Sequence, residues 1–128
     1  MPGPGLVFQM NPPDGNHVWI VISDEVGGCV LTVNVTDIAH YPDSPCVLQI
    51  GDHPAITKRS AIAYRRAKAR PARRIDECIA EGTLRRLSNC SPDLLARIIE
   101  GARQADDLTP RLQRIYLPPG PTSGSVQG

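Results

Sequence analysis

The residues with the clearest chemical potential form a basic run at positions 58–74. This run holds eight of the fourteen Lys and Arg residues of the chain and no acidic residue, and no Lys or Arg precedes Lys58. The formal charge is −6 over residues 1–57, +8 over residues 58–74 and −1 over residues 75–128. Such a local positive field attracts phosphate polyanions or an acidic protein segment, although a charge run is also typical of a solvated face. The residues that we expect to contact a nucleic acid are Lys58, Arg59, Tyr64, Arg65, Arg66, Lys68 and Arg70.

Two aromatic residues, Trp19 and Tyr64, could stack on a nucleic-acid base. Aromatic residues make up only 4% of the chain, so few rings are left to build the core. Burial of both rings in the core is therefore the alternative to a role in binding, and the composition favours it.

The four cysteines, Cys29, Cys46, Cys78 and Cys90, are widely and irregularly spaced. None of them forms a CxxC pair, and no two of the three histidines stand at a spacing typical of metal ligands. Because the chain has no signal peptide, we expect reduced thiols that pack as small hydrophobic side chains. The sequence thus predicts neither a metal site nor a cofactor.

Proline and glycine crowd the two ends of the chain, which has 13 Pro and 11 Gly among 128 residues. We therefore predict a flexible N-terminus at residues 1–15, a single folded domain at residues 16–117 and a disordered tail at residues 118–128. The sequence contains no secretory signal and no run of roughly 20 apolar residues that could span a membrane. We expect a soluble, cytoplasmic protein.

Three segments in the first half of the chain predict strands. Residues 17–23 (HVWIVIS) are a continuous apolar run rich in β-formers, and residues 29–36 alternate cleanly between apolar and polar side chains. The Gly27-Gly28 pair between them predicts the sharp turn of a hairpin. Residues 46–50 predict a third, shorter strand.

Residues 60–67 are ambiguous between helix and strand. Their alanines and arginines favour a helix by intrinsic propensity. However, Ser60, Ile62 and Tyr64 alternate with small alanines, and Pro71 stops the pattern soon after. We favour a strand, because a short barrel needs another strand at this place.

The periodicity changes to that of helices in the second half. Ile75, Cys78 and Ile79 predict a short amphipathic helix that ends at Gly82. Residues 91–93 (Ser-Pro-Asp) predict a second helix, with a Ser cap and Pro at the first helical position. The expected buried stripe of this helix is Leu94, Leu95, Ile98, Ile99 and Ala102. The order of elements predicts an α+β fold that is mainly β, with a curved sheet closed by C-terminal helices.

The segments HVWIVIS, GGCVLTVNVTD and SPCVLQI, followed by the helical half that starts at RRIDECIAEG, resemble the PemK/MazF (CcdB-like) toxin superfamily. The resemblance covers residues 16–105, and the GDHP turn is similar to that of outlying members. It implies a small SH3-like barrel with C-terminal helices. In that family the second strand ends in an element with Thr or Ser, which here reads NVTD and corresponds to Thr36.

The chain departs from this family at the start of the first strand. Ribonucleases of the family typically place an Arg there, whereas this chain has His17. Metal-independent RNA cleavage through the 2′-hydroxyl needs a base, an acid and a cation that holds the phosphate. We expect His17 and His53 to supply the base and the acid, and Thr36 to orient the phosphate. The residues that would hold the phosphate are Lys58, Arg59 or Arg65.

Both histidines also have a plainer interpretation. His17 could simply cap a strand, and His53 could fill a turn. Pro54 bears on the conformation of His53, because the residue before a proline is pushed toward an extended conformation; we therefore expect His53 to be presented in the turn and not absorbed into a helix.

Two functions from different classes follow. The first is a PemK/MazF-like toxin of a type II toxin–antitoxin pair, a metal-independent endoribonuclease. The resemblance implies that such a toxin forms a homodimer and is neutralised by an antitoxin with a flexible acidic segment. The second is a non-catalytic SH3-like module that binds nucleic acid or a protein partner through residues 58–74. The two histidines favour the first function and the missing Arg favours the second; an accessory domain in a larger assembly is a third option.

Overall fold

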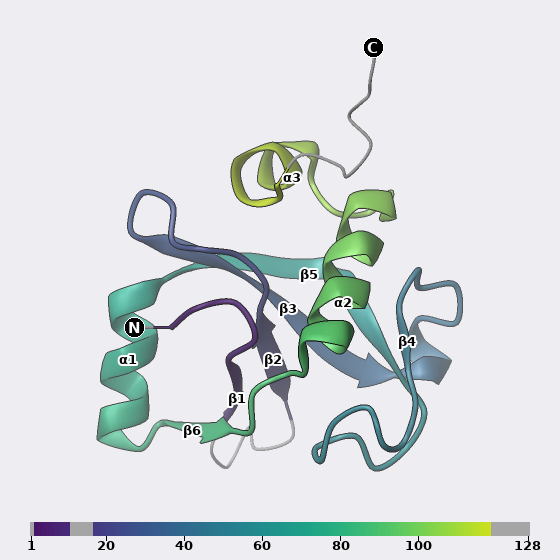
Figure 1. Ribbon diagram of the computed structural model, residues 1–128, viewed down its shortest axis with the longest axis horizontal. Coiled ribbons are helices and arrows are strands. Elements are labelled where there is room, and N and C mark those ends of the chain that lie inside the picture. Colours follow the sequence, from purple (N-terminus) through teal and green to yellow (C-terminus); the bar gives the residue numbers. More distant parts are fainter. Residues whose placement is uncertain (1, 11–16, 119–128) are drawn as a thin grey trace.

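The computed structural model describes residues 2–10 and 17–118, and its fold is α+β and mainly β. One antiparallel sheet of six strands, in the order β4-β5-β3-β2-β1-β6, curls into a half-barrel that carries three helices (Figure 1). The strands are β1 (Val7–Met10), β2 (Val18–Val21), β3 (Cys29–Asp37), β4 (Val47–Leu48), β5 (Ser60–Pro71) and β6 (Leu84–Leu87). The helices are α1 (Ala72–Glu81), α2 (Pro92–Gln104) and α3 (Pro110–Tyr116), with a 3₁₀ turn, η1, at Ile38–His40. The predicted fold class, an SH3-like barrel with C-terminal helices, is consistent with this architecture.

The strands predicted from alternation and from β-rich composition are confirmed. β2 and β3 form the predicted hairpin, in which Val18 pairs with Val35 and Val21 pairs with Thr32. The ambiguous segment at residues 60–67 is a strand, and it continues as β5 to Pro71. β4 is shorter than predicted and pairs only through Val47 and Leu48.

The prediction of a flexible N-terminus is wrong for β1, which lies inside the sheet between β2 and β6. Val7 and Phe8 are fully buried there. The proline and glycine residues on both sides of this short apolar run concealed a strand, because their composition is typical of a tether. Residues 11–16, which include the rest of the predicted flexible segment, and residues 119–128 of the predicted tail lie outside the described residues.

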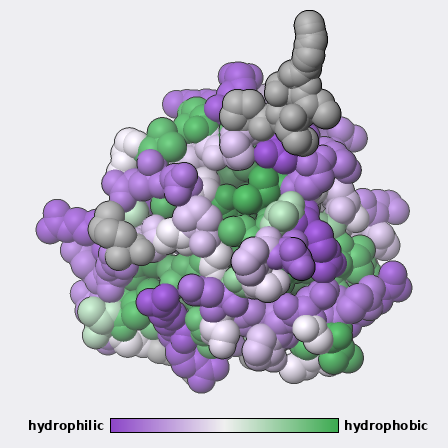
Figure 2. Space-filling view, in the orientation of Figure 1, coloured by the Kyte–Doolittle hydropathy of each residue, from purple (hydrophilic) through white to green (hydrophobic). Residues whose placement is uncertain are grey.

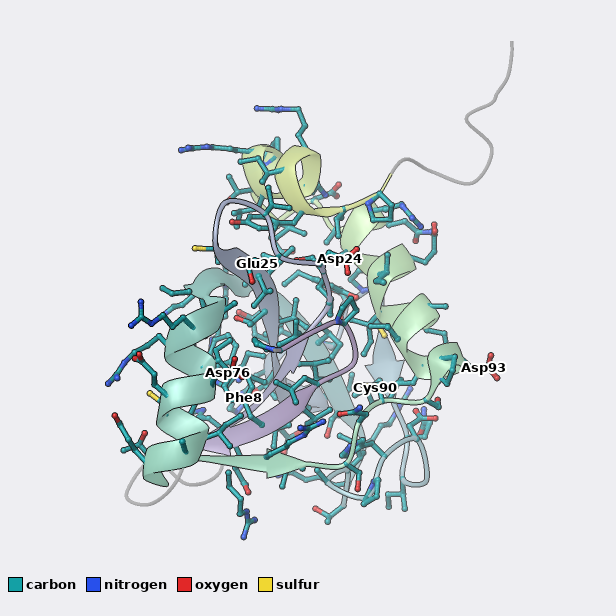
Figure 3. The ribbon with its side chains drawn as sticks, turned by 60° about the vertical axis from the view of Figure 1, so that its left-hand side comes forward. Phe8, Asp24, Glu25, Asp76, Cys90 and Asp93 are labelled. Atoms are coloured by element: carbon teal, nitrogen blue, oxygen red, sulfur yellow. The ribbon has the colours of Figure 1, made fainter. Side chains whose placement is uncertain are left out.

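The sheet has two apolar faces, as a result of the alternation of side chains along each strand. On one, which we call the α2 face, Val7, Ile20 and Val33 pack against α2. On the other, the α1 face, Phe8 and Trp19 pack against α1 with Val21, Val30, Ile75 and Leu84. Phe8 lies beside α1, whereas Cys90 lies beside the start of α2 (Figure 3).

Helix α2 begins and packs as predicted. The Ser91 hydroxyl oxygen accepts a hydrogen bond from the backbone N–H of Leu94, and Pro92 occupies the first helical position. Leu94, Ile98 and Ala102 are buried against the sheet, and the other two residues of the predicted stripe pack partly against it. Helix α1 ends as predicted at Gly82, whose φ of 87° is in the left-handed region that glycine adopts without strain.

Gly101 lets α2 approach the sheet closely. The Tyr64 ring from β5 lies against it, and the Tyr64 hydroxyl donates a hydrogen bond of 2.7 Å to the carbonyl oxygen of Ile98. A Cβ at position 101 would overlap this hydroxyl and would lie 3.1 Å from the Cβ of Cys46. None of the helices in the described part of the chain is long and apolar enough to cross a membrane.

Candidate nucleic-acid interface

A cationic cleft of about 530 Å³ opens on the α1 face, between the start of β2 and the second half of β5. We call it the basic cleft. Its lining residues are Met10, His17, Trp19, Asn34, Arg66, Lys68 and Arg70. Four of these residues were predicted as site residues, and none of the described residues that line the cleft is acidic. Its volume falls within the range typical of small-ligand sites.

A bulge in β5 with three extra residues brings the basic side chains to this face. Asn34 pairs with Ala63, but Thr32, two positions away in β3, pairs with Lys68. Residues 64–67 of β5 therefore lie opposite the single residue Val33. Because this excess is an odd number of residues, the side chains of β5 change faces across the bulge.

The pairing partners show the change of face directly. Ile62, before the bulge, belongs to the α2-face cluster together with Val33. Lys68, after the bulge, pairs with Thr32, which in turn pairs with Val21 of the α1-face cluster. Strict alternation along β5 would have placed Ile62 and Lys68 on the same face, so the bulge is what gives the basic cleft its charge.

Arg70 lies at the centre of the basic cleft. Its guanidinium carbon is 4.3 Å from the centroid of the Trp19 ring, and its Nε donates a hydrogen bond of 3.1 Å to the Thr32 hydroxyl oxygen. That hydroxyl donates in turn to the carbonyl oxygen of Lys68, at 2.8 Å. Partial burial lowers the pKa of Arg70, because it disfavours the charged form.

The basic side chains of this cleft have no acidic partner among the described residues. Within residues 2–10 and 17–118, no carboxylate forms an ion pair with Arg66, Lys68 or Arg70. A cation that is partly removed from water and lacks a counter-charge is stabilised by a bound anion. The cleft is therefore arranged to attract an anionic group.

The floor of the cleft contains two polar atoms that have no protein partner. Trp19 and Asn34 face each other across β2 and β3, and they are 7% and 1% exposed. The indole Nε1 of Trp19 and the Oδ1 of Asn34 are buried without a hydrogen-bond partner among the described residues. The other end of the Asn34 amide is used, since its Nδ2 donates to the carbonyl oxygen of Val18 at 3.3 Å. Unsatisfied buried groups of this kind are rare in folded proteins.

The remaining residues of the predicted basic surface lie elsewhere. Lys58 forms an ion pair of 2.8 Å with Asp37, which holds the pKa of that carboxyl below its ordinary value. Arg59 is exposed, and Arg65 donates from Nε to the Tyr41 hydroxyl oxygen at 2.9 Å. The predicted interface is thus split, and only its C-terminal part lines the basic cleft.

Tyr64 is a core residue rather than a surface for base stacking, so its predicted role in binding is wrong. The side chain is 1% exposed and its hydroxyl is used in the hydrogen bond to Ile98. Burial, the main cause, raises the pKa of Tyr64 well above its ordinary value. The alternation that placed Tyr64 in a strand with Ile62 also places both residues on the α2 face.

The two histidines that were predicted to act together are used differently. His17 is exposed and lines the basic cleft, and the register of β2 and β3, continued by one residue, puts it opposite Thr36. His53 is 7% exposed and does not line this cleft. The structure therefore does not bring the predicted base and acid to one phosphate, and it corrects the assignment of His53.

His53 has a structural role that accounts for its burial. Its Nδ1 accepts a hydrogen bond of 2.9 Å from the backbone N–H of Ala55, and its Nε2 is hydrogen-bonded to the carbonyl oxygen of Ser88. Since an N–H donates to Nδ1, the Nε2 carries the proton that is donated to Ser88. This bond links the loop after β4 to the chain after β6, and so connects the two edge strands of the half-barrel. Arg97 fastens the same loop to α2 through an ion pair of 3.2 Å with Asp52.

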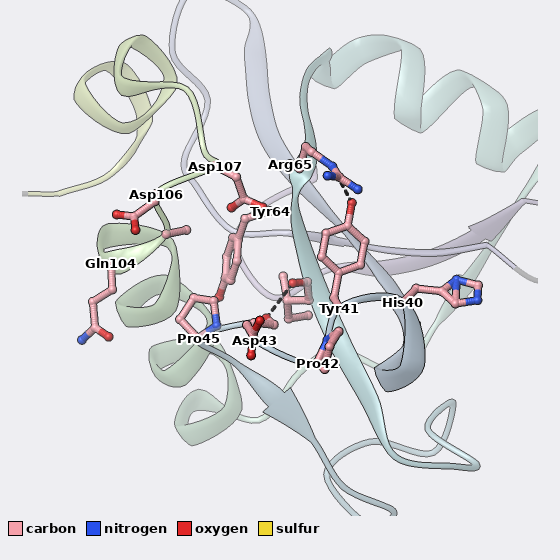
Figure 4. A pocket seen from close by; sticks show the side chains of 13 residues that line it. His40, Tyr41, Pro42, Asp43, Pro45, Tyr64, Arg65, Gln104, Asp106 and Asp107 are labelled. Carbon is pink, nitrogen blue, oxygen red and sulfur yellow. Dashed lines mark hydrogen bonds between the residues drawn. The ribbon is translucent and has the colours of Figure 1, made fainter.

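A second cleft, of about 460 Å³, lies between the loop after η1 and the end of α2. Figure 4 shows Tyr41 and Arg65 on one side of it and Asp106 and Asp107 on the other. Asp43 adds a third acidic side chain to its lining. We call it the mixed-charge cleft; its carboxylates make it a poor site for a polyanion.

The cysteines and the acidic residues supply no metal site in the described part of the chain, where no group of three His, Cys, Asp or Glu residues could hold an ion. All four cysteines are free thiols. Burial, with the nearby Cys46 as a smaller cause, raises the pKa of the Cys90 thiol to about 11, which keeps it protonated and unreactive near neutral pH.

Comparison with protein-family models, with curated proteins and with solved structures gave no match for this chain. The resemblance to the PemK/MazF superfamily therefore stays a prediction, and the functional argument rests on the geometry of the basic cleft.

Sequence reasoning missed the floor of this cleft. Met10 was assigned to a flexible segment, and Asn34 was noted only as part of the element that contains Thr36. A polar residue at a position of β3 that faces a tryptophan was the available signal. Without the register of β2 and β3, however, nothing in the sequence marked Asn34 as buried.

Proposed function

We propose that this protein is a non-catalytic module that binds single-stranded RNA through the basic cleft. The observation that carries the proposal is the set of three basic side chains, Arg66, Lys68 and Arg70, that share one cleft and lack ion pairs among the described residues. Phosphate groups of a nucleic-acid backbone supply the missing anions. A single strand is favoured over a duplex because the cleft has the size of a small-ligand site, not of a groove-spanning surface.

The test is the affinity for a labelled uridine oligomer, followed by fluorescence anisotropy between about 50 and 200 mM salt. Contact with up to three phosphates predicts a log–log slope of up to about −2, since each phosphate on a single strand contributes about −0.7. The double variant R66E/K68E should weaken binding strongly and flatten this slope.

A matched control separates the cleft from general charge. Arg111 and Arg114 lie in α3, outside the basic cleft, and R111E/R114E changes the net charge by the same amount. Unchanged affinity in R66E/K68E, or an equal loss in both double variants, would contradict binding at the basic cleft.

A second candidate is the PemK/MazF-like toxin, an endoribonuclease acting in the cytoplasm. The observation that favours it is the register that puts His17 opposite Thr36 beside the basic cleft. With His53 used in the fold, His17 alone would have to serve as acid–base catalyst. RNA cleavage that persists in excess chelator and leaves a 2′,3′-cyclic phosphate would support this activity.

His17→Ala tests the catalytic role of this residue. It should lower such cleavage about 10²–10⁴-fold, the usual contribution of a positioned acid or base, without a matching loss of RNA binding. Intact RNA after prolonged incubation with the unmodified protein would leave the binding module as the function.

The toxin hypothesis also implies partners. An antitoxin with a flexible acidic segment would compete with RNA for the basic cleft, and the toxin would form a homodimer. The direct test asks whether a neighbouring short reading frame encodes a small acidic protein, and whether co-expression of that protein restores growth. Growth inhibition that such a protein fails to relieve would argue against the pairing.

A further inference from the structure

We infer that Trp19 and Asn34 form a nucleobase-binding floor in the basic cleft, with Arg70 occupying the place of the base in the free protein. This inference rests on the proposed binding of RNA and adds a recognition element to it. It starts from the Nε1 of Trp19 and the Oδ1 of Asn34, which are buried and have no hydrogen-bond partner among the described residues. Such groups are retained in native proteins where another partner satisfies them.

The two unsatisfied atoms are complementary to polar groups of a nucleotide. Trp19 offers an N–H donor and Asn34 offers a carbonyl acceptor, from residues that pair directly across β2 and β3. The hydrogen bond from Nδ2 of Asn34 to Val18 fixes which end of the amide is the free acceptor. The indole N–H lies in the plane of the Trp19 ring, so a base stacked on that ring presents its edge donor to Oδ1 of Asn34, while a ribose or phosphate oxygen of the same nucleotide can accept from Nε1. Every nucleobase has a donor on its edge, so the floor suits a base without selecting one base strictly.

Arg70 covers the face on which a base would stack. Its planar guanidinium lies 4.3 Å from the centroid of the Trp19 ring, a spacing typical of stacked planar groups. The guanidinium makes one side-chain hydrogen bond, to Thr32. It forms no ion pair with a described residue. An arriving base can therefore displace the guanidinium, which is then free to bind the adjoining phosphate.

This arrangement distinguishes RNA from a bare polyanion. A chain of phosphates without bases can neutralise Arg66 and Lys68, but it supplies neither a planar group for Trp19 nor a donor for Asn34. The same holds for an acidic peptide made of glutamate. The inference therefore predicts selectivity for ligands with bases at equal charge.

The experiment uses the unmodified protein, because Trp19 is the single tryptophan of the chain and its emission reports on this site alone. A uridine oligomer of about ten nucleotides, an abasic oligomer of the same length and polyglutamate are titrated in turn, and anisotropy of labelled copies measures their binding. We expect the uridine oligomer to bind at least tenfold more tightly than the abasic one and to quench Trp19 emission. The other two ligands should leave the emission nearly unchanged.

The outcomes separate the inference from the proposed function. Equal affinity for both oligomers, or equal quenching by the abasic oligomer or by polyglutamate, would overturn the base-binding floor while leaving the phosphate-binding cleft intact. Binding of neither oligomer would overturn the proposed function and the inference with it.

Two variants give a second readout. Asn34→Leu, which keeps the size of the side chain and removes the acceptor, should narrow the difference in affinity between the uridine and the abasic oligomer. Asn89→Leu, at an exposed position outside the cleft, is its control. Arg70→Lys removes the planar cover, and we expect acrylamide to quench Trp19 more strongly in this variant before any ligand is added. If acrylamide quenches Trp19 equally in Arg70→Lys and in the unmodified protein, the role of Arg70 as a cover is contradicted.

Discussion

Two regions of the molecule differ in how completely their buried polar groups are satisfied. Away from the α1 face, the Tyr64 hydroxyl bonds to Ile98, and both ring nitrogens of His53, in the loop after β4, have backbone partners. On the α1 face, the Thr32 hydroxyl is likewise satisfied. On the α1 face, Trp19 and Asn34 bury atoms without partners among the described residues, beside the partly buried cation of Arg70. A buried polar group left unsatisfied costs about 1–3 kcal/mol. The α1 face therefore differs in retaining two buried polar atoms, Nε1 of Trp19 and Oδ1 of Asn34, that a ligand can satisfy.

Exposed hydrophobic residues are dispersed over the described surface. On the side drawn in Figure 2, hydrophobic residues form separate patches among hydrophilic ones. Exposed large hydrophobic residues are few and scattered, and include Val26, Ile50 and Ile115. The described surface therefore offers charge and shape in the basic cleft as its main basis for binding.

The largest effect should come from overfilling the α2 face. Gly101→Ala introduces a Cβ that overlaps the Tyr64 hydroxyl, so Tyr64 must move and lose its bond to Ile98. We expect a loss of about 3 kcal/mol in the free energy of unfolding, measured with urea, from overpacking and the lost hydrogen bond together. Tyr64→Phe in the Gly101→Ala background should recover part of it, because it removes the overlapping oxygen. A loss below about 0.5 kcal/mol in Gly101→Ala would mean that α2 is not seated against Tyr64 as described.

A smaller loss is expected where the satisfied, buried side chain of His53 is removed. His53→Leu leaves the N–H of Ala55 and the carbonyl of Ser88 unpaired, so we expect a loss of about 2–3 kcal/mol in urea unfolding. RNA affinity should be unchanged, because His53 does not line the basic cleft. Loss of RNA binding at full stability would instead restore His53 as a binding residue.

Asn34→Leu is the matched test on the α1 face and should leave the free energy of unfolding nearly unchanged. It removes an unsatisfied acceptor together with one long hydrogen bond to Val18, so the free energy of unfolding should stay within about 1 kcal/mol of the original value. If this variant is as destabilised as His53→Leu, the two regions do not differ in the way described.

The smallest effect concerns the loop that His53 anchors. The N–H of Gln49 and then Arg97 lower the pKa of Asp52. A carboxyl whose pKa is lower in the folded state contributes stability that is present above its unfolded pKa of about 3.9 and is lost as pH falls through the folded pKa. Asp52→Asn should therefore flatten the acid limb of the stability curve and cost under about 1 kcal/mol at neutral pH, since the pair is near the surface. An acid limb identical to that of the unmodified protein would show that Asp52 does not contribute to the pH dependence of stability.

The sequence predicted the fold class because β2, β3, α1 and α2 each carry a strong local pattern, such as the alternation at residues 29–36 and the Ser91 cap. The pattern of β5 was ambiguous, and the need of a barrel for another strand decided it. Sequence reasoning missed β1 and β6, since a four-residue strand gives little periodicity to read. β6 also has two arginines, Arg85 and Arg86, at its centre.

The candidate site was predicted only in part, for a different physical reason. Arg66, Lys68 and Arg70 were identified from charge, and the cleft that collects them depends on pairing between segments far apart in the chain. The partner of His53 is likewise 35 residues away. Long-range contacts of this kind leave no trace in local composition, so the roles of both histidines required the structure.

The bulge in β5 also predicts which changes in chain length the strand can accept. Deleting one residue from 65–67, with the pairing of β5 shifted by one, would turn the following part of β5 over, carrying Lys68 and Arg70 away from the cleft and the exposed Ala69 toward it. Deleting two residues would preserve the facing of every later side chain. Insertions and deletions in this segment should therefore be accepted in steps of two.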